Sequence, residues 1–193
     1  MMRLLLLLIG LFAATPSFAG VPRYALVKDK SSLTFVAFMN GAPVAGKFDD
    51  FTADIHFDPN QPAKSSIRVE VNTSSVSVEN DDVLKNIQLP DWLSVVKFPT
   101  AVLICNGLSR FPQTDDYYAG FNGAGDCELT LRGRTLPVEL NFQMEHFDGG
   151  TAIANGYVTL HRLDFGIGQG QWAKDDVIKD EVRVNFRVTA EKK

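Results

Sequence analysis

Three histidines and two cysteines are the side chains that could do chemistry with a metal or as a nucleophile. His56, His146 and His161 each stand at a polar position within a segment of alternating apolar and polar residues. Alternation places such positions on the outer face of a strand, so the three imidazoles should lie apart on the surface. Because a metal site needs ligands that converge on one ion, we predict exposed strand histidines and no metal site.

Glycine-rich and acidic segments offer equally little chemistry. Residues 120–125 have a glycine spacing similar to that of a phosphate loop, but a strand and not a helix is expected after them. The charged residues between 174 and 181 mix acidic residues with lysines, as in a solvated loop rather than a calcium site. The serines lack the context of a nucleophile elbow. The sequence therefore predicts no enzyme active site and no cofactor.

The two cysteines are candidates for a disulfide bond. Cys105 and Cys127 fall on the apolar faces of two consecutive expected strands. Pairing them centres the hairpin on residues 115–116, where a turn is expected, and places Leu103 opposite Leu129. Directly opposed residues on one face of an antiparallel pair lie close enough to be bridged. We predict a Cys105–Cys127 bond; two buried free thiols are the alternative if a local bulge turns one thiol away.

The N-terminus has the features of a secretory signal peptide, residues 1–19. Arg3 precedes a short apolar run, and small residues occupy positions 17 and 19. The run is too short to span a bilayer, so we expect cleavage after Ala19 and a periplasmic mature chain. Residues 20–193 have the size of one domain, and an oxidising compartment permits the disulfide.

The charge balance limits the partners of the mature chain. The formal net charge is −4, and removal of Arg3 leaves −5 (−4 − 1). An acidic domain without a basic cluster does not attract nucleic acid. We therefore expect no nucleic-acid partner.

Most of the mature chain alternates between apolar and polar residues with a period of two. In the last such segment, residues 182, 184, 186 and 188 are apolar and residues 183, 185 and 187 are polar. Comparable segments predict strands at 24–27, 32–39, 44–57 (bent at 49–50), 67–71, 103–105, 127–131, 138–144 and 157–163. Short turns connect most of them, one of which is expected at 133–135.

One helix is expected among the strands. Asn80 or Asp81 can cap a helix over residues 82–89, and Leu89 is the last of its periodic apolar residues. Pro90 ends this helix. Trp92 follows it directly and should lie close to the same end of the fold.

These elements predict an all-β fold, an eight-stranded antiparallel barrel with one short helix that caps or covers its mouth. Alternation of strands with helices is absent, which disfavours a parallel sheet. Closure of an antiparallel meander removes its edges, and about eight strands leave room for a filled core or one elongated small ligand. A two-sheet sandwich is the structural alternative.

The apolar faces of the strands should point into the barrel. With Trp92 and Phe165 added, they supply the following ligand-binding candidates: Phe35, Phe48, Ile55, Phe57, Val69, Val71, Trp92, Leu103, Leu129, Leu131, Leu140, Phe142, Leu160, Phe165, Val184 and Phe186. From the residues alone, a packed core without ligand is slightly favoured over a cavity. A tunnel along the axis would be lined by five of these residues, namely Phe35, Phe57, Leu131, Leu140 and Phe186.

Short motifs occur in a characteristic order along the mature chain. They are residues 29–35 (DKSSLTF), 46–48 (GKF) with Phe51, 55–59 (IHFDP), 98–101 (FPTA), 129–133 (LTLRG) and 162–168 (RLDFGIG). Their order and spacing resemble the YceI-like family of secreted bacterial proteins, and they cover nearly the whole mature chain. Members of that family are lipocalin-like barrels that bind polyisoprenoids or other long-chain lipids.

The resemblance implies a lined cavity in place of a packed core. Its expected ligand is a long-chain isoprenoid, a quinone or a fatty-acyl lipid, with the helix as a lid and Trp92 near the entrance. We therefore predict a non-enzymatic periplasmic carrier for such a lipid. An enzyme that acts on a lipid-like substrate has the least support, because no catalytic set converges. The oligomeric state stays open, with a homodimer among the options.

The ending of the chain suggests an alternative role. Residues 168–172 with 180–182 are similar to a subgroup associated with di-haem b-type membrane cytochromes. This similarity implies an interaction module that works with a membrane cytochrome and a quinone redox system.

The chain departs from the family pattern at two places. Residues 125–128 lengthen the segment before Leu129, which suggests a bulge or a shifted register. Cys105 stands where the family usually has a serine, so the resemblance says nothing about the cysteines.

Overall fold

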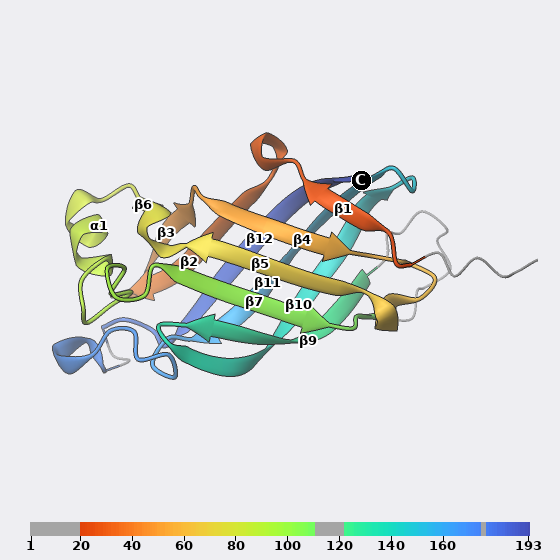
Figure 1. Ribbon diagram of the computed structural model, residues 1–193. Coiled ribbons are helices and arrows are strands. Elements are labelled where there is room, and N and C mark those ends of the chain that lie inside the picture. Colours follow the sequence, from red (N-terminus) through yellow and green to blue (C-terminus); the bar gives the residue numbers. More distant parts are fainter. Residues whose placement is uncertain (1–19, 111–121, 175–176) are drawn as a thin grey trace, which may run out of the picture.

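The computed structural model describes residues 20–110, 122–174 and 177–193. The expected signal peptide and the turn expected at residues 115–116 lie outside the described residues. Within them, every strand pairing is antiparallel, as the alternation and short turns predict (Figure 1).

Eight strands form a closed ring. In ring order they are β1 (Arg23–Leu26), β4 (Phe51–His56), β5 (Ser66–Asn72), β7 (Thr100–Asn106), β9 (Asn122–Leu131), β10 (Arg134–Phe147), β11 (Thr151–His161) and β12 (Glu181–Lys192). The pairing of β12 with β1 closes the ring. The predicted eight-stranded antiparallel barrel is confirmed, and the two-sheet sandwich is wrong because no pair of sheet edges separates the strands into two layers.

β2 (Ser32–Met39), β3 (Ala42–Phe48) and β6 (Val76–Val78) extend the wall at one end, and the short strand β8 (Ser109–Arg110) lies at the other end. β2 pairs with the first half of β12, β3 pairs with β2, and β6 pairs with β3. β8 pairs with β9. The single bent strand expected over residues 44–57 is therefore wrong. Its halves, β3 and β4, have different partners, because the bend at residues 49–50 sends the chain from the extension into the ring.

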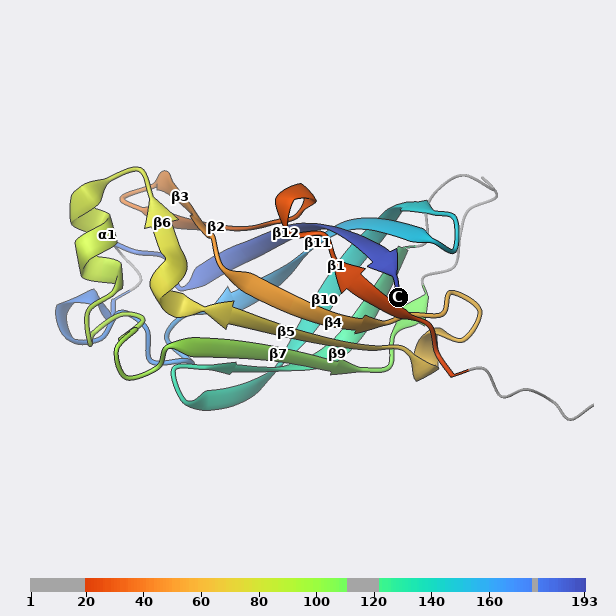
Figure 2. The same cartoon turned by 45° about the horizontal axis from the view of Figure 1, so that its top comes forward.

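The helix α1 (Asp81–Ile87) covers the end of the barrel formed by β3 and β6 (Figures 1 and 2). The Asn80 side chain caps it by accepting hydrogen bonds from the backbone N–H groups of Asp82 and Val83. Leu89 lies beyond its last residue and is 50 % exposed, so its expected place on the apolar helix face is wrong. Single-turn 3-10 helices occur at Lys28–Lys30, Pro62–Lys64, Thr73–Ser75 and Gly170–Trp172.

Two tight hairpins depend on left-handed backbone conformations. Asn40 and Gly41 both have positive φ, as do Arg132 and Gly133. Two-residue hairpin loops of this kind match the right-handed twist of the flanking strands, and they favour glycine at the second position. The second of these turns lies at residues 132–133, one residue earlier than expected, since β10 begins at Arg134.

β9 keeps one register with β10 along its whole length, and its register with β7 and β8 shifts by one residue between Cys127 and Ala124. Cys105 pairs with Cys127 and Leu103 with Leu129 across β7 and β9, as predicted. The pairing of β9 with β10 runs without a shift from residue 122 to 131, so a bulge in β9 at 125–128 is wrong. The shifted register, the other option, occurs against β7 and β8, where residues 106–108 face residues 125–126. The additional residues simply lengthen the strand.

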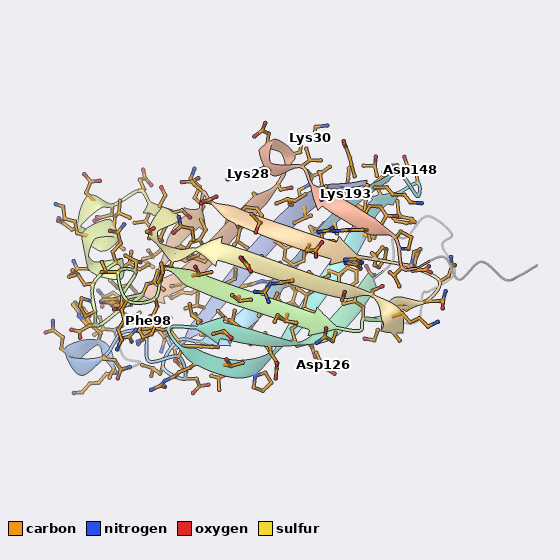
Figure 3. The ribbon with its side chains drawn as sticks, viewed as in Figure 1. Lys28, Lys30, Phe98, Asp126, Asp148 and Lys193 are labelled. Carbon is orange, nitrogen blue, oxygen red and sulfur yellow. A yellow bond between two sulfur atoms is a disulfide. The ribbon has the colours of Figure 1, made fainter. Side chains whose placement is uncertain are left out.

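The polar faces of the strands point outward. Asp126 on β9 points away from the barrel, and Asp148 and Lys193 lie at the end opposite α1 (Figure 3). No helix in the described part of the chain is long and apolar enough to cross a membrane.

Candidate functional site

The inside of the ring holds an apolar cavity of about 290 Å³. Its wall includes residues from every strand of the ring, together with Ile87 of α1. Two hydroxyl groups in the wall are bonded to the backbone: Thr73 Oγ1 donates to the carbonyl of Phe98 at 2.7 Å, and Tyr24 Oη donates to that of Gly149 at 3.2 Å. Such a cavity suits an apolar ligand and offers no group for acid–base chemistry.

The structure places all sixteen ligand-binding candidates in the cavity wall. They are Phe35, Phe48, Ile55, Phe57, Val69, Val71, Trp92, Leu103, Leu129, Leu131, Leu140, Phe142, Leu160, Phe165, Val184 and Phe186. The five residues expected to line a tunnel are among them, so the predicted register holds on each of their strands.

Aromatic side chains close the end of the cavity opposite α1. The ring of Phe147 lies 6.1 Å from that of Tyr24 and 5.6 Å from that of Phe57, centroid to centroid. Tyr24 is 2 % exposed, and its burial raises the pKa of the phenol, with a smaller contribution from Asp58. The phenol is therefore neutral at physiological pH, which suits an apolar wall.

The opposite end of the cavity is formed by α1 and two loops. Trp92, half-buried in the loop after α1, lies 5.9 Å from Trp172 between ring centroids. The backbone N–H of Gly168 donates to the carbonyl of Asp91 at 2.7 Å, which ties the two loops together. The two loops and α1 thus form the wall of the cavity at this end. Trp92 is part of this wall, and this is the end at which the sequence predicts the entrance.

Arg162 organises the second of these loops from inside. The residue is 2 % exposed, and its guanidinium donates to the carbonyls of Ile178 at 2.7 Å and Trp172 at 3.0 Å. It also donates to the carbonyls of Ile167 and Lys179, each at 3.0 Å. A buried cation that holds several loop carbonyls fixes the loop and keeps its polar groups out of the apolar cavity.

A second cavity, of about 190 Å³, lies beside the first at the α1 end. It is lined by Phe35, Ala37, Phe38, Met39, Val44, Asp82, Val83, Asn86, Ile87, Trp92, Trp172 and Ile178. Five of these residues, Phe35, Ala37, Ile87, Trp92 and Ile178, also line the first cavity. The two cavities therefore share a wall.

Several cavity residues were missed by the sequence reasoning. Alanines at 37, 53, 101, 152 and 154 line the first cavity, and their small size leaves the space open. Ala37 and Ala53 stand at apolar positions of the predicted alternating segments, so the alternation contained their signal. The other three lie in the continuous apolar runs 101–105 and 152–154, where alternation does not show which face points inward. Arg162 was missed for a different reason: its partners are loop carbonyls, which leave no trace in the sequence.

The three histidines lie outside the cavity and apart from one another. His146 Nε2 is 3.3 Å from an oxygen of Asp148, and His161 Nδ1 is 3.1 Å from one of Asp180. His56 has a side chain that is 38 % exposed. In the part of the chain that the structure describes, no group of three potential ligands could hold a metal ion.

A disulfide bond joins Cys105 and Cys127 at the cross-strand pair between β7 and β9. Their Cα atoms are 4.2 Å apart, and both residues are buried. The bond lies within the hydrophobic core at the end of the barrel where Leu108 packs. Both sulfurs are used in this bond, so neither is available as a nucleophile.

Comparison with known proteins identifies the family. The model of the YceI-like domain matches residues 24–190. The chain belongs to the YceI-like family. A UPF0312 protein of Shewanella sp. (strain MR-7) is 28 % identical over 173 residues, which is 86 % of this chain and 87 % of that protein. A UPF0312 protein of Pseudomonas aeruginosa (strain LESB58) is 31 % identical over 127 residues, 63 % of this chain and 62 % of its own length.

Solved structures share the fold of this chain. Burkholderia cenocepacia BcnA superposes with a TM-score of 0.74 at 22 % identity, covering 85 % of this chain and 98 % of BcnA. A polyisoprenoid binding domain from Saccharophagus degradans gives a TM-score of 0.68 at 15 % identity, covering 88 % and 98 %. These two proteins therefore share the barrel fold with this chain.

Proposed function

We propose that this YceI-like protein is a periplasmic, non-enzymatic carrier that holds the tail of a polyisoprenoid, a quinone or another long-chain lipid inside its barrel. The observation that carries the proposal is the apolar cavity enclosed by the ring of strands, whose Thr73 and Arg162 side chains are bonded to backbone carbonyls. The polyisoprenoid-binding domain with the same fold supports the choice of ligand class. The N-terminal sequence supports export.

The energetics of such binding are favourable without a polar anchor. Burial of roughly 400 Å² of a prenyl tail at about 25 cal/mol per Å² contributes on the order of 10 kcal/mol. The ordering of a flexible chain and the loss of free motion offset a large part of this gain. The remainder is sufficient for micromolar or tighter binding. Selectivity for a head group then has to come from outside the apolar wall.

Extraction of the purified protein with organic solvent, followed by mass spectrometry, tests the proposal. We expect a long-chain lipid at close to one molecule per chain. Ala154→Phe places a ring in the cavity, and it should lower the lipid content roughly tenfold, the size expected for overpacking a filled site. Thr159→Phe adds the same ring on the exposed face of the same strand and should leave the content unchanged.

Two results would contradict the carrier. One is wild-type protein without lipid after purification from its native compartment. The other is equal lipid content in the Ala154→Phe and wild-type proteins. An empty barrel that co-purifies with a membrane cytochrome would favour the role of an interaction module, which the similarity of residues 168–172 implies.

A further inference from the structure

The second cavity has the position of a passage between the surface and the inner cavity. Its outer edge includes Phe38 of the β2–β3 hairpin, which is 44 % exposed. Its inner edge is the wall shared with the main cavity, where Phe35, Ile87 and Trp92 lie. A chain that entered between α1 and the hairpin would meet this shared wall first.

Phe35 is the phenylalanine of the shared wall, and it lies on β2. It is 6 % exposed, and its ring lies 5.7 Å from that of Phe48, centroid to centroid. It pairs directly with Gly46 across β2 and β3. A methyl group on Gly46 would overlap Cζ of Phe35 and would lie 2.6 Å from its Cε1. The ring thus occupies the space that a side chain at position 46 would otherwise fill.

The surroundings decide where a displaced ring would go. The same methyl group would lie 2.6 Å from Cγ1 of Val78, so β6 blocks that side, and Phe48 packs against another. The two cavities are the open space around Phe35. Because a packed interior resists compression, the ring would turn into the boundary between the cavities.

Two other glycines also lie opposite a phenylalanine on the neighbouring strand, but a side chain there would collide with the backbone as well as with the ring. Gly123 pairs with Phe142, and Gly156 pairs with Phe186. A methyl group on Gly123 would lie 2.6 Å from a backbone carbonyl oxygen, and one on Gly156 would overlap another. At Gly46 the close neighbours are the side chains of Phe35 and Val78. Gly46 can therefore be changed with the least effect on the backbone.

We infer that the second cavity is the passage through which the lipid tail enters and leaves, and that Gly46 keeps it open by seating the ring of Phe35. This inference rests on the proposed function and assigns a route to it. Gly46 is a specificity-determining position, because the position of the Phe35 ring sets the width of the lipid tail that can pass through the second cavity.

The experiment measures the rate at which delipidated protein takes up a long-tailed ubiquinone from phosphatidylcholine vesicles. Gly46→Ala should slow uptake and release about tenfold or more, as expected when overpacking narrows a filled path. Phe35→Leu in the Gly46→Ala background should restore the rates, because the smaller side chain no longer fills the boundary. Gly150→Ala is the matched control, since its methyl group would meet only Asp148 Oδ1, at 3.4 Å.

A second variant covers the case in which Gly46→Ala does not fold. Val44→Phe places a ring in the second cavity from β3 and keeps the glycine at position 46, and it should slow uptake by a similar factor. Uptake at the wild-type rate in a folded Gly46→Ala or Val44→Phe protein would overturn the inference and leave the carrier function intact. Slow uptake that Phe35→Leu fails to restore would also overturn it. Wild-type protein that takes up no ubiquinone and yields no lipid on extraction would overturn both.

Discussion

Removal of the Cys105–Cys127 bond offers a quantitative test of how the barrel is stabilised. The two cysteines are 22 residues apart in the sequence. In the chain-entropy model, a cross-link that closes a loop of this length stabilises the folded state by about 3 kcal/mol, because it restricts the unfolded chain. For a domain of this size each kcal/mol corresponds to about 2–4 °C, so the double variant should melt about 6–12 °C lower.

The substitutions are Cys105→Ala and Cys127→Ala together, which leave no buried hydroxyl group. Thermal and urea unfolding of the double variant are compared with those of the oxidised wild type and the wild type under a reductant. The neighbouring pair, Leu103 and Leu129, still holds the register of the folded state. Because the unfolded chain exposes more surface without the cross-link, we expect a steeper slope of the urea transition. If the free energy of unfolding fell by less than about 1 kcal/mol, the reasoning would be refuted, because the loss of loop-closure entropy in the unfolded chain would not then determine the effect of the bond.

Three further predictions concern the α1 end and the surface. In a Trp172→Phe background, the fluorescence of Trp92 should change when a long-tailed ubiquinone is loaded; an unchanged spectrum at saturation, with binding shown independently, would place Trp92 away from the ligand. Arg162→Met should destabilise the protein by about 3 kcal/mol or more, because several buried carbonyls lose a charged donor; urea unfolding measures this, and a loss under about 1 kcal/mol would contradict it. Backbone N–H groups of Thr151 and Gly150 hold the pKa of Asp148 below its usual range. This carboxylate therefore contributes stability above about pH 4, the pKa expected in the unfolded chain, and the contribution is lost as the pH falls through the lower folded pKa. Asp148→Asn should reduce the fall of the unfolding free energy between about pH 4 and lower pH, measured by urea unfolding at several pH values. An unchanged pH dependence would exclude Asp148 as a source of this fall.

Most of the strands and of the cavity wall could be predicted because most strands carry a two-residue period of their own. Val182, Val184, Phe186 and Val188 alternate with polar residues, and all four line the cavity. A strand with one face buried in a closed sheet shows this alternation in its own sequence, whichever strands it pairs with. The cross-strand pair at Cys105 followed from the same logic, with the centre of the hairpin as the further constraint.

The parts that could not be predicted depend on which segments become neighbours. Alternation continues through β3 and β4, so it cannot show that the two strands pair with different parts of the barrel. The role of Arg162 depends on loop carbonyls, which any sequence supplies. The seat under Phe35 arises because Gly46 is its cross-strand partner, and a glycine in a strand does not indicate which ring it accommodates.

The pairing of β1 with β12 has a consequence for engineering. The backbone N–H of Lys193 donates to the carbonyl of Arg23 at 2.9 Å, so the first and last strands end side by side. They do so at the end of the barrel opposite α1 (Figure 2). A short flexible linker could join these two points, and new termini could then be opened in an exposed turn such as Asp148–Gly150, giving a circular permutant with the same ring of strands. By the same geometry, a surface or fusion partner attached at either end would hold the barrel with its α1 end facing outward.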